Sequence, residues 1–503
     1  MEFDLIVRNG IIVTASEILQ PGLDIGITDG KIACIGVSLP ASAKTHIIDA
    51  EGAYVTPGGV DSHVHLAQRN APTGDGWETG SRSAIAGGTT TIIAFASQQK
   101  SDISLYPVLE DYDKKAKDQS YADYGFHFIL TNPTREILRD ELPVMASEHG
   151  ITSVKLYMTY EAMKLNDREV LNILFACKNL GMTTMIHAES HDMISMIIEG
   201  LERNKNTEPY FHAVARPRIA EDEASYRAIS LAELADAPML IVHMSSEVAV
   251  SHVREAQTRL LPIHAETCPH YLFLLSEEIK GKPHDHFSGA KHVCSPPLRH
   301  SPADLESLWQ SVANGTFTTF SSDHAPSKYD HPGGKQLGMV DGIPRFTKIP
   351  NGLPGVETRV PLLFSRTPAC LPAEKAKLSL PRFVQLTASN PAKLYGLGGR
   401  KGSIAPGFDA DLVIWHPGNT GAVTISQGLM HHDIDYTPFE GIEVGNWPRY
   451  TILRGQVVWD ESKGVVGSMG YGQYLKRGKG EVLTGKTGHL PRGMIEDERK
   501  YWL

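Results

Sequence analysis

The sequence is poor in cysteine, contains no basic run, and lacks a long apolar stretch at its N-terminus. Its five cysteines lie far apart and form no Cys-X-X-Cys pair, which excludes a disulfide framework and a zinc-finger pattern. The net charge of −10, without clustered Lys and Arg, argues against nucleic acid or an anionic membrane as the main partner. Glu2, Asp4 and Arg8 interrupt the first apolar residues, so this end predicts a strand rather than a signal peptide or membrane span, and we expect a cytoplasmic protein.

The 503 residues exceed one typical domain, and two kinds of pattern divide them. Short β-rich runs separated by Asn-Gly and Asp-Gly turns fill the first fifty residues, and similar runs recur at 411–415 and 451–459. Between these ends, apolar strand-like runs alternate with longer helical stretches, as is typical of βα units on a parallel sheet. The predicted helical stretches include 104–118, 167–180, 221–236 and 247–259.

Eight strand-like runs predict a closed (β/α)₈ barrel of the TIM type. The runs are AYVTPGG, TTTIIAFA, GFHFILT, ITSVKLYM, TTMIHAE, MLIVHMS, PIHAETC and FTTFSSD. We predict that the barrel covers 57–395 and that 1–56 and 396–465 together form a small composite β-sandwich beside it. The remaining residues, 466–503, are rich in Gly and Lys and predict either a loose end or an arm that packs on another subunit.

Polar residues able to bind metal recur at the carboxyl ends of five of these runs. In a (β/α)₈ barrel these ends converge on one mouth, so side chains far apart in sequence meet there. The residues are His63, His65, Lys155, His187, His243 and Asp323.

Taken singly, most of these residues have an ordinary explanation. A lone histidine such as His187 is more often a hydrogen-bonded structural residue, and Asp323 is compatible with a helix N-cap. Lys155 differs, because it lies in the apolar run SVKLYM, where an unpaired buried ammonium is costly. The joint occurrence at matched strand ends therefore favours a site.

The spacing of the histidines suggests two metal ions. His63 and His65 point the same way along a strand and can bind one ion, while His187 and His243 can bind a second. Two dications held about 3.5–4 Å apart by neutral imidazoles repel each other and need an anionic bridge. Lys155, after reaction with carbon dioxide, would supply a bridging carbamate, and Asp323 a further carboxylate. Such a pair of ions makes hydroxide available near neutral pH, a competent nucleophile for an amide carbonyl.

With these residues in place, the chain resembles the dihydropyrimidinase and hydantoinase branch of the amidohydrolase superfamily along nearly its whole length. The matching motifs are PGGVDSHVH, AGGTTTII, TSVKLYMTY, HAES, VHMSS, AETCPHYL, CSPPLR, SSDHAP and PNGLPGVETR. The resemblance implies a TIM-like barrel with a composite β-sandwich, two zinc ions (manganese or cobalt being alternatives), a carboxylated lysine and a homotetramer or dimer. Its members hydrolyse cyclic amides to N-carbamoyl amino acids.

The resemblance also implies roles for individual residues. The metal ligands fall on the six residues named above, with Lys155 as the carboxylated lysine. Tyr160 matches the tyrosine that donates to the developing oxyanion, and Ser295 and Asn351 match positions whose main-chain groups hold the ring, although both also suit ordinary turns. Asp323 matches the proton shuttle between the attacking water and the leaving nitrogen.

Several departures bear on the substrate. Gln68 and Arg69 stand where hydantoinases place apolar residues near the ring substituent; they either make this pocket more polar or face solvent. His270 replaces the usual glutamine, a form shared with dihydroorotases and allantoinases. Ala67 stands where a dihydroorotase has a carboxylate-binding arginine, which disfavours that activity.

We therefore predict a cyclic amidohydrolase acting on a hydantoin or dihydropyrimidine. Allantoinase-like opening of a ureide ring by the same residues is the alternative. A third hypothesis, a non-catalytic assembly protein of the same fold, is disfavoured because such relatives have lost metal ligands and all six are present here.

Overall fold

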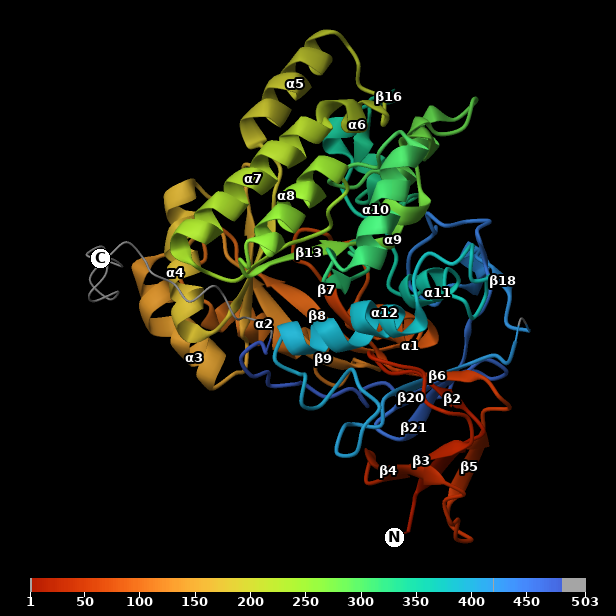
Figure 1. Cartoon of the computed structure of the whole chain (residues 1–503). Coiled ribbons are helices and arrows are strands. Elements are labelled where there is room, and N and C mark those ends of the chain that lie inside the picture. The colour runs from red at the N-terminus through yellow and green to blue at the C-terminus, as the bar shows by residue number, and fades with distance from the viewer. Residues whose placement is uncertain (1, 419, 482–503) are drawn as a thin grey trace.

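The computed structural model describes residues 2–418 and 420–481, and its centre is an eight-stranded parallel sheet (Figure 1). The strands follow one another in chain order, and an isolated parallel bridge from Val64 to His324 joins the first to the segment after the last. The predicted barrel is confirmed. Its strands are β7 (Gly59–Val64), β8 (Thr89–Ser97), β9 (Asp123–Ile129), β10 (Ser153–Tyr157), β11 (Thr183–His187), β12 (Met239–Ile241), β13 (Ile263–Thr267) and β14 (Thr319–Phe320).

Helices surround this sheet, and the four predicted helical stretches appear as α2, α4, α7 and α8. The α-helices are α1 (Trp77–Ala86), α2 (Tyr106–Ala116), α3 (Leu142–Ser147), α4 (Asp167–Leu180), α5 (His191–Arg203), α6 (Phe211–Ala215), α7 (Arg218–Ala235), α8 (Glu247–Thr258), α9 (Pro269–Phe273), α10 (Pro302–Asn314), α11 (Arg359–Phe364), α12 (Leu380–Val384) and α13 (Asn390–Leu394). No helix in the described part of the chain is long and apolar enough to cross a membrane.

Helix α4 shows how local sequence produces these elements. Asn166 caps its first turn by accepting from the Glu169 amide, and the Glu169 side chain accepts from the Asn166 amide in return. Gly181, at φ 69°, ends the helix in the left-handed conformation that glycine adopts without strain. One apolar stripe faces the barrel, and its buried members are Val170, Ile173, Leu174 and Cys177.

Two sheets beside the barrel combine strands from distant parts of the sequence. A four-stranded sheet contains β4 (Lys31–Val37), β3 (Leu23–Thr28), β1 (Leu5–Arg8) and β5 (His46–Asp49). A six-stranded sheet contains β2 (Ile11–Ile12), β6 (Tyr54–Pro57), β17 (Leu412–Trp415), β20 (Pro448–Leu453), β21 (Gln456–Asp460) and β22 (Gly464–Val465). The antiparallel pairing of β6 with β17 confirms the composite architecture, whereas the exact domain boundaries stay predictions. Two small hairpins complete the strands: β15 (Met339–Val340) with β16 (Ile343–Pro344), and β18 (Val423–Thr424) with β19 (Glu443–Val444).

The segment that follows the last strand packs against the amino-terminal end of the barrel. Tyr474 forms a parallel bridge with Tyr124 of β9, and the Leu475 amide donates to the Tyr124 carbonyl at 2.7 Å. Arg477 is buried and donates to the Ser153 hydroxyl at 2.9 Å. This part of the predicted tail therefore contacts the chain's own barrel, whereas 482–503, the rest of the loose end or arm predicted over 466–503, lies outside the described residues.

Candidate active site

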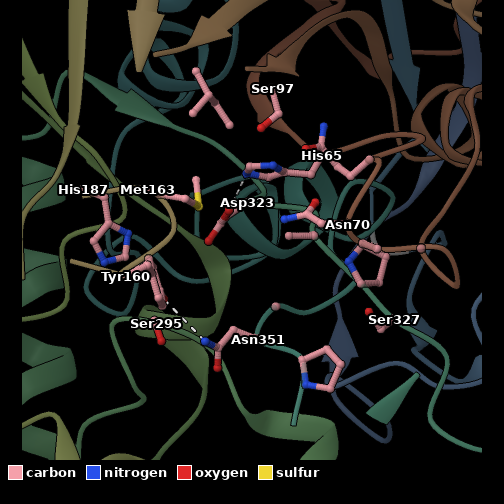
Figure 2. Close-up of a pocket in the computed structure, with 18 of the residues that line it drawn as sticks. His65, Asn70, Ser97, Tyr160, Met163, His187, Ser295, Asp323, Ser327 and Asn351 are labelled. Carbon is pink, nitrogen blue, oxygen red and sulfur yellow. Dashed lines mark hydrogen bonds and ion pairs between the residues drawn. The ribbon is translucent and has the colours of Figure 1, made fainter. Parts of the chain in front are cut away.

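The six predicted metal ligands meet at the carboxyl-terminal end of the barrel. His63 lies in β7, Lys155 in β10 and His187 at the end of β11, while the other three follow β7, β12 and β14 directly. Parallel strands in a barrel bring these ends together, as the sequence pattern predicts. Figure 2 shows His65, His187 and Asp323 facing one cavity.

Distances within the cluster are those of groups around a common centre. Nε2 of His63 lies 3.1 Å from Oδ1 of Asp323 and 3.4 Å from Nζ of Lys155. Nε2 of His65 lies 3.7 Å from the same Asp323 oxygen. The rings of His187 and His243 have centroids 4.5 Å apart. His63, His243 and Asp323 place potential ligand atoms within 4.8 Å of one another, so the donor set fits a metal ion.

Two buried carboxylates orient His63 and His187 by contacting one nitrogen of each ring. Oε1 of Glu266 lies 2.6 Å from Nδ1 of His63, and Oε2 of Glu189 lies 2.6 Å from Nε2 of His187. Each carboxylate engages one ring nitrogen and leaves the other for the cluster, as is usual for metal-binding histidines. Nδ1 of His243 is buried and has no hydrogen-bond partner in the described part of the chain.

The protonation of the cluster also suits a cation. Burial lowers the pKa of His187, takes the pKa of His65 to about 3, and lowers the pKa of His243 well below its usual value. These imidazoles are therefore neutral, the form that binds metal. Burial alone would raise the pKa of Asp323, but His63 and His65 lower it, so the carboxylate is ionised.

Lys155 is fully buried and forms no ion pair with a described residue; its Nζ is within hydrogen-bond distance of His63. Its ammonium lies 5.2 Å from the ring centroids of Phe95 and Tyr157. Burial lowers the pKa of Lys155 to about 8. Asp323 and Glu266 act on this ammonium electrostatically, but neither forms the direct ion pair that usually accompanies a buried ammonium group.

The four histidines and Asp323 line a cavity of about 400 Å³. Tyr160, Ser295 and Asn351, the three predicted substrate contacts, line the same cavity, where Figure 2 shows them side by side, and the ring of Tyr160 lies 5.4 Å from that of His187. Nδ2 of Asn351 lies 3.5 Å from Oη of Tyr160. Burial raises the pKa of Tyr160 to about 12, so its hydroxyl remains a hydrogen-bond donor at neutral pH.

Three residues of this region have a strained backbone. Tyr160, His243 and Asp323 have φ angles of 67°, 40° and 47°, a left-handed conformation that non-glycine residues rarely adopt. Such conformations persist where the surrounding structure imposes them, and they cluster at functional sites. Here they accompany the turns by which the chain leaves three barrel strands.

Of the three residues that differ from the hydantoinase pattern, Gln68, Arg69 and His270, only one lines the cavity. Gln68 lines the cavity, and its amide donates to the Phe95 carbonyl at 2.7 Å. Arg69 does not line it and instead pairs with Asp111 at 3.0 Å and Asp102 at 3.3 Å. His270 is buried behind the cavity wall and is not among the lining residues.

Sequence reasoning missed the groups that support the ligands. Glu266 and Glu189 both lie inside motifs quoted above, each at a strand end, but nothing in their spacing shows which histidine nitrogen they occupy. His324, next to Asp323, is fully buried, and its Nε2 lies 3.0 Å from Oδ2 of Asp75. Asp75 thereby connects the loop after β7 to the segment that carries Asp323.

Residues 54–458 match the model of the amidohydrolase family. The chain belongs to this family. It is 41% identical to the D-hydantoinase of Geobacillus stearothermophilus, over 94% of this chain and 96% of the relative. It is 39% identical to the D-hydantoinase of Ralstonia pickettii, over 95% and 99%. These amidohydrolases confirm the resemblance drawn from the motifs.

Solved amidohydrolase structures agree with this result. A dihydropyrimidinase from Brevibacillus agri superimposes with a TM-score of 0.87 at 38% identity, covering 94% of this chain and 98% of that one. An L-hydantoinase (dihydropyrimidinase) from Arthrobacter aurescens superimposes with a TM-score of 0.80 at 27% identity, covering 94% and 100%.

Proposed function

We propose that this chain hydrolyses the cyclic amide bond of a hydantoin or dihydropyrimidine to an N-carbamoyl amino acid. The observation that carries the proposal is that four histidines and Asp323 line one cavity together with Tyr160, Ser295 and Asn351, while Lys155 lies beneath them against His63. Relatives with up to 41% identity over nearly the full chain are named hydantoinases.

Two divalent ions, zinc in the simplest case and manganese or cobalt as alternatives, fit the donor set. His63 and His65 would hold one ion, His187 and His243 the other, and Asp323 would add a carboxylate. The burial of Lys155 without an ion-pair partner among the described residues supports its conversion to N6-carboxylysine, in which the neutral Nζ bonds to the carbon of carbon dioxide and releases a proton. Such ions polarise a carbonyl and lower the pKa of water.

The protein's own groups then act on the ring. Asp323 accepts the proton of the attacking water and returns it to the leaving ring nitrogen, a transfer that typically contributes about 10²–10⁴-fold. The Tyr160 hydroxyl donates a hydrogen bond to the carbonyl oxygen as negative charge develops there. The main-chain groups of Ser295 and Asn351 hold the amide of the ring in place.

The test combines metal analysis with a substrate panel. Protein purified without chelator is expected to contain about two equivalents of divalent metal and to open dihydrouracil, hydantoin or phenylhydantoin. Protein without stoichiometric metal, or without activity on any of these rings and succinimide, would contradict the proposal. Activity on allantoin alone would assign the allantoinase-like alternative.

A homo-oligomer, either dimer or tetramer, is part of the proposal. It is supported by large apolar side chains exposed on the outer helices: Met196 on α5 is 75% exposed, and Ile219 and Tyr226 on α7 are each 59% exposed. A contact with another subunit would bury such side chains. Light scattering on the purified protein gives the mass directly, and a monomer at micromolar concentration would contradict this part.

A further inference from the structure

Lys335 is a second buried lysine near the cavity, and the mechanism above does not use it. It opens a short 3₁₀ turn, Lys335–Gly338, in the long connection after Asp323, and its side chain is fully buried. Its Nζ donates to three main-chain carbonyls: Val293 at 3.2 Å, Pro350 at 2.9 Å and Gly352 at 2.9 Å. Only the ammonium form has three protons to donate, so these contacts require the charged lysine.

The three carbonyls belong to the two segments that carry the substrate contacts. Pro350 and Gly352 flank Asn351, and Val293 lies two residues before Ser295. The Gly352 amide also donates to the Val293 carbonyl at 3.0 Å, which joins the two segments to each other. Lys335 is therefore the point where the connection after Asp323 meets both of these segments.

Neighbouring carbonyls around Ser295 are held in a similar way. Nε2 of His212 lies 2.8 Å from the Cys294 carbonyl, and the Tyr271 hydroxyl donates to the Pro296 carbonyl at 2.7 Å. Among the described residues, the main-chain carbonyls of Ser295 and Asn351 receive no such donor. On both segments, protein donors occupy the flanking carbonyls and leave the central one for the cavity.

A structural role alone accounts poorly for a lysine here. Lys335 forms no ion pair with a described residue, and burial of an ammonium without an acidic partner is costly. Burial lowers the pKa of Lys335 to about 7, with the Cys294 thiol as the one group acting in the opposite direction. An apolar side chain of equal length would fill the same space without this cost, so the three directed hydrogen bonds are what the lysine adds.

We propose that Lys335 is a positioning residue for the ring: it turns the carbonyls of Pro350 and Gly352 away from the cavity and thereby presents the main-chain groups of Asn351 and Ser295 to the cyclic amide. The inference rests on the proposed function, because it assigns Lys335 to the binding of that substrate. It assigns Lys335 no part in proton transfer.

The test is steady-state kinetics of the full-length, metal-loaded enzyme on its best ring substrate. Lys335→Met removes all three donors, and Lys335→Gln retains two. The Michaelis constant is expected to rise about ten- to hundredfold in Lys335→Met and less in Lys335→Gln, because small displacements of a positioning group have effects of this size. The kcat value and metal content should stay within about threefold of wild type.

The matched control is Lys348→Met, which alters an exposed lysine in the same connection and is expected to leave both constants unchanged. If Lys335→Met fails to fold, Lys335→Gln alone decides the question. An unchanged Michaelis constant in a folded variant, or an equal fall in kcat with loss of metal, would overturn the inference while leaving the proposed function intact. A metal-loaded wild type inactive on every ring would overturn both.

Discussion

The two ends of the barrel each bury a lysine, and the surroundings of these lysines differ completely. At the carboxyl-terminal end, Lys155 has only His63 as a close polar neighbour, at 3.4 Å. At the opposite end, Lys401 reaches three carboxylates: Asp123 at 2.6 Å, Asp411 at 2.7 Å and Asp409 at 3.0 Å. Burial lowers the pKa of Lys155, whereas Asp411, Asp123 and Asp409 outweigh burial and raise the pKa of Lys401.

The difference distinguishes a lysine of the proposed active site, Lys155, from a lysine that links two parts of the fold, Lys401. Asp123 belongs to strand β9 of the barrel, while Asp409 and Asp411 precede strand β17 of the composite sheets, so Lys401 links two parts of the molecule. Its charge is matched within the protein and needs no ligand. Lys155 has no such ion pair, and it lies among groups able to bind a metal, a combination that favours a ligand site.

Lys155→Ala should have the largest effect of the variants that test this comparison. It removes the anion proposed to bridge the two ions, so activity is expected to fall by on the order of 10⁴-fold or more, as for catalytic groups that act as a unit. Metal content, measured by mass spectrometry, should fall below two equivalents while the circular dichroism spectrum is retained. A variant with full metal and full rate would show that Lys155 is not the bridge.

Asp323→Asn tests the same end without removing the bridge. Turnover is expected to fall by about 10²–10⁴-fold, because an amide cannot accept the proton of the attacking water. The Michaelis constant should change much less, since the residues that hold the ring are untouched. Near-normal turnover would assign the proton transfer to another base.

Lys401→Met tests the opposite end. Removing one partner from a buried ion cluster leaves unmatched charge, so the free energy of unfolding should fall by about 3–5 kcal/mol, measured by urea titration. The folded fraction should keep its metal and its kcat. Lys31→Met is the matched control: Lys31 also pairs with Asp409, but its side chain is 53% exposed, and the expected loss is below about 1 kcal/mol. An equal loss of unfolding free energy in Lys401→Met and Lys31→Met would contradict the structural role given to Lys401.

Tyr160→Phe should have the smallest effect of the four. It removes one donor to the developing oxyanion, and kcat is expected to fall by about 10²-fold at unchanged metal content. Tyr226→Phe, on the exposed face of α7, serves as the control and should leave kcat unchanged. An unaltered kcat in Tyr160→Phe would mean that the oxyanion is stabilised elsewhere.

The sequence could predict the features that follow from the regular alternation of strand-like and helical runs. Alternating strand-like and helical runs predicted the barrel, and polar residues at the run ends predicted that His63, His187, His243 and Asp323 would share a mouth. Strand ends translate directly into positions in a barrel, so sequence order was enough there.

The parts that sequence could not predict depend on contacts between distant irregular segments. Lys401 lies 278 residues from Asp123, and neither is set apart by its local pattern. Lys335 lies in a Gly-rich polar stretch that suggests an exposed loop, although the folded chain buries it completely. Arg69 was as plausible at the cavity as Gln68 until the paths of their side chains were known.

The packing of residues 466–481 against β9 bears on the order in which the molecule is assembled during synthesis. Gln473 and Asp123 are separated by 350 positions, so a nascent chain emerges from the ribosome with every barrel strand before the residues that cover the barrel's amino-terminal end. Until then Tyr124 lacks Tyr474, its partner in a late backbone bridge. Completion of this end therefore depends on residues that are synthesised after every barrel strand.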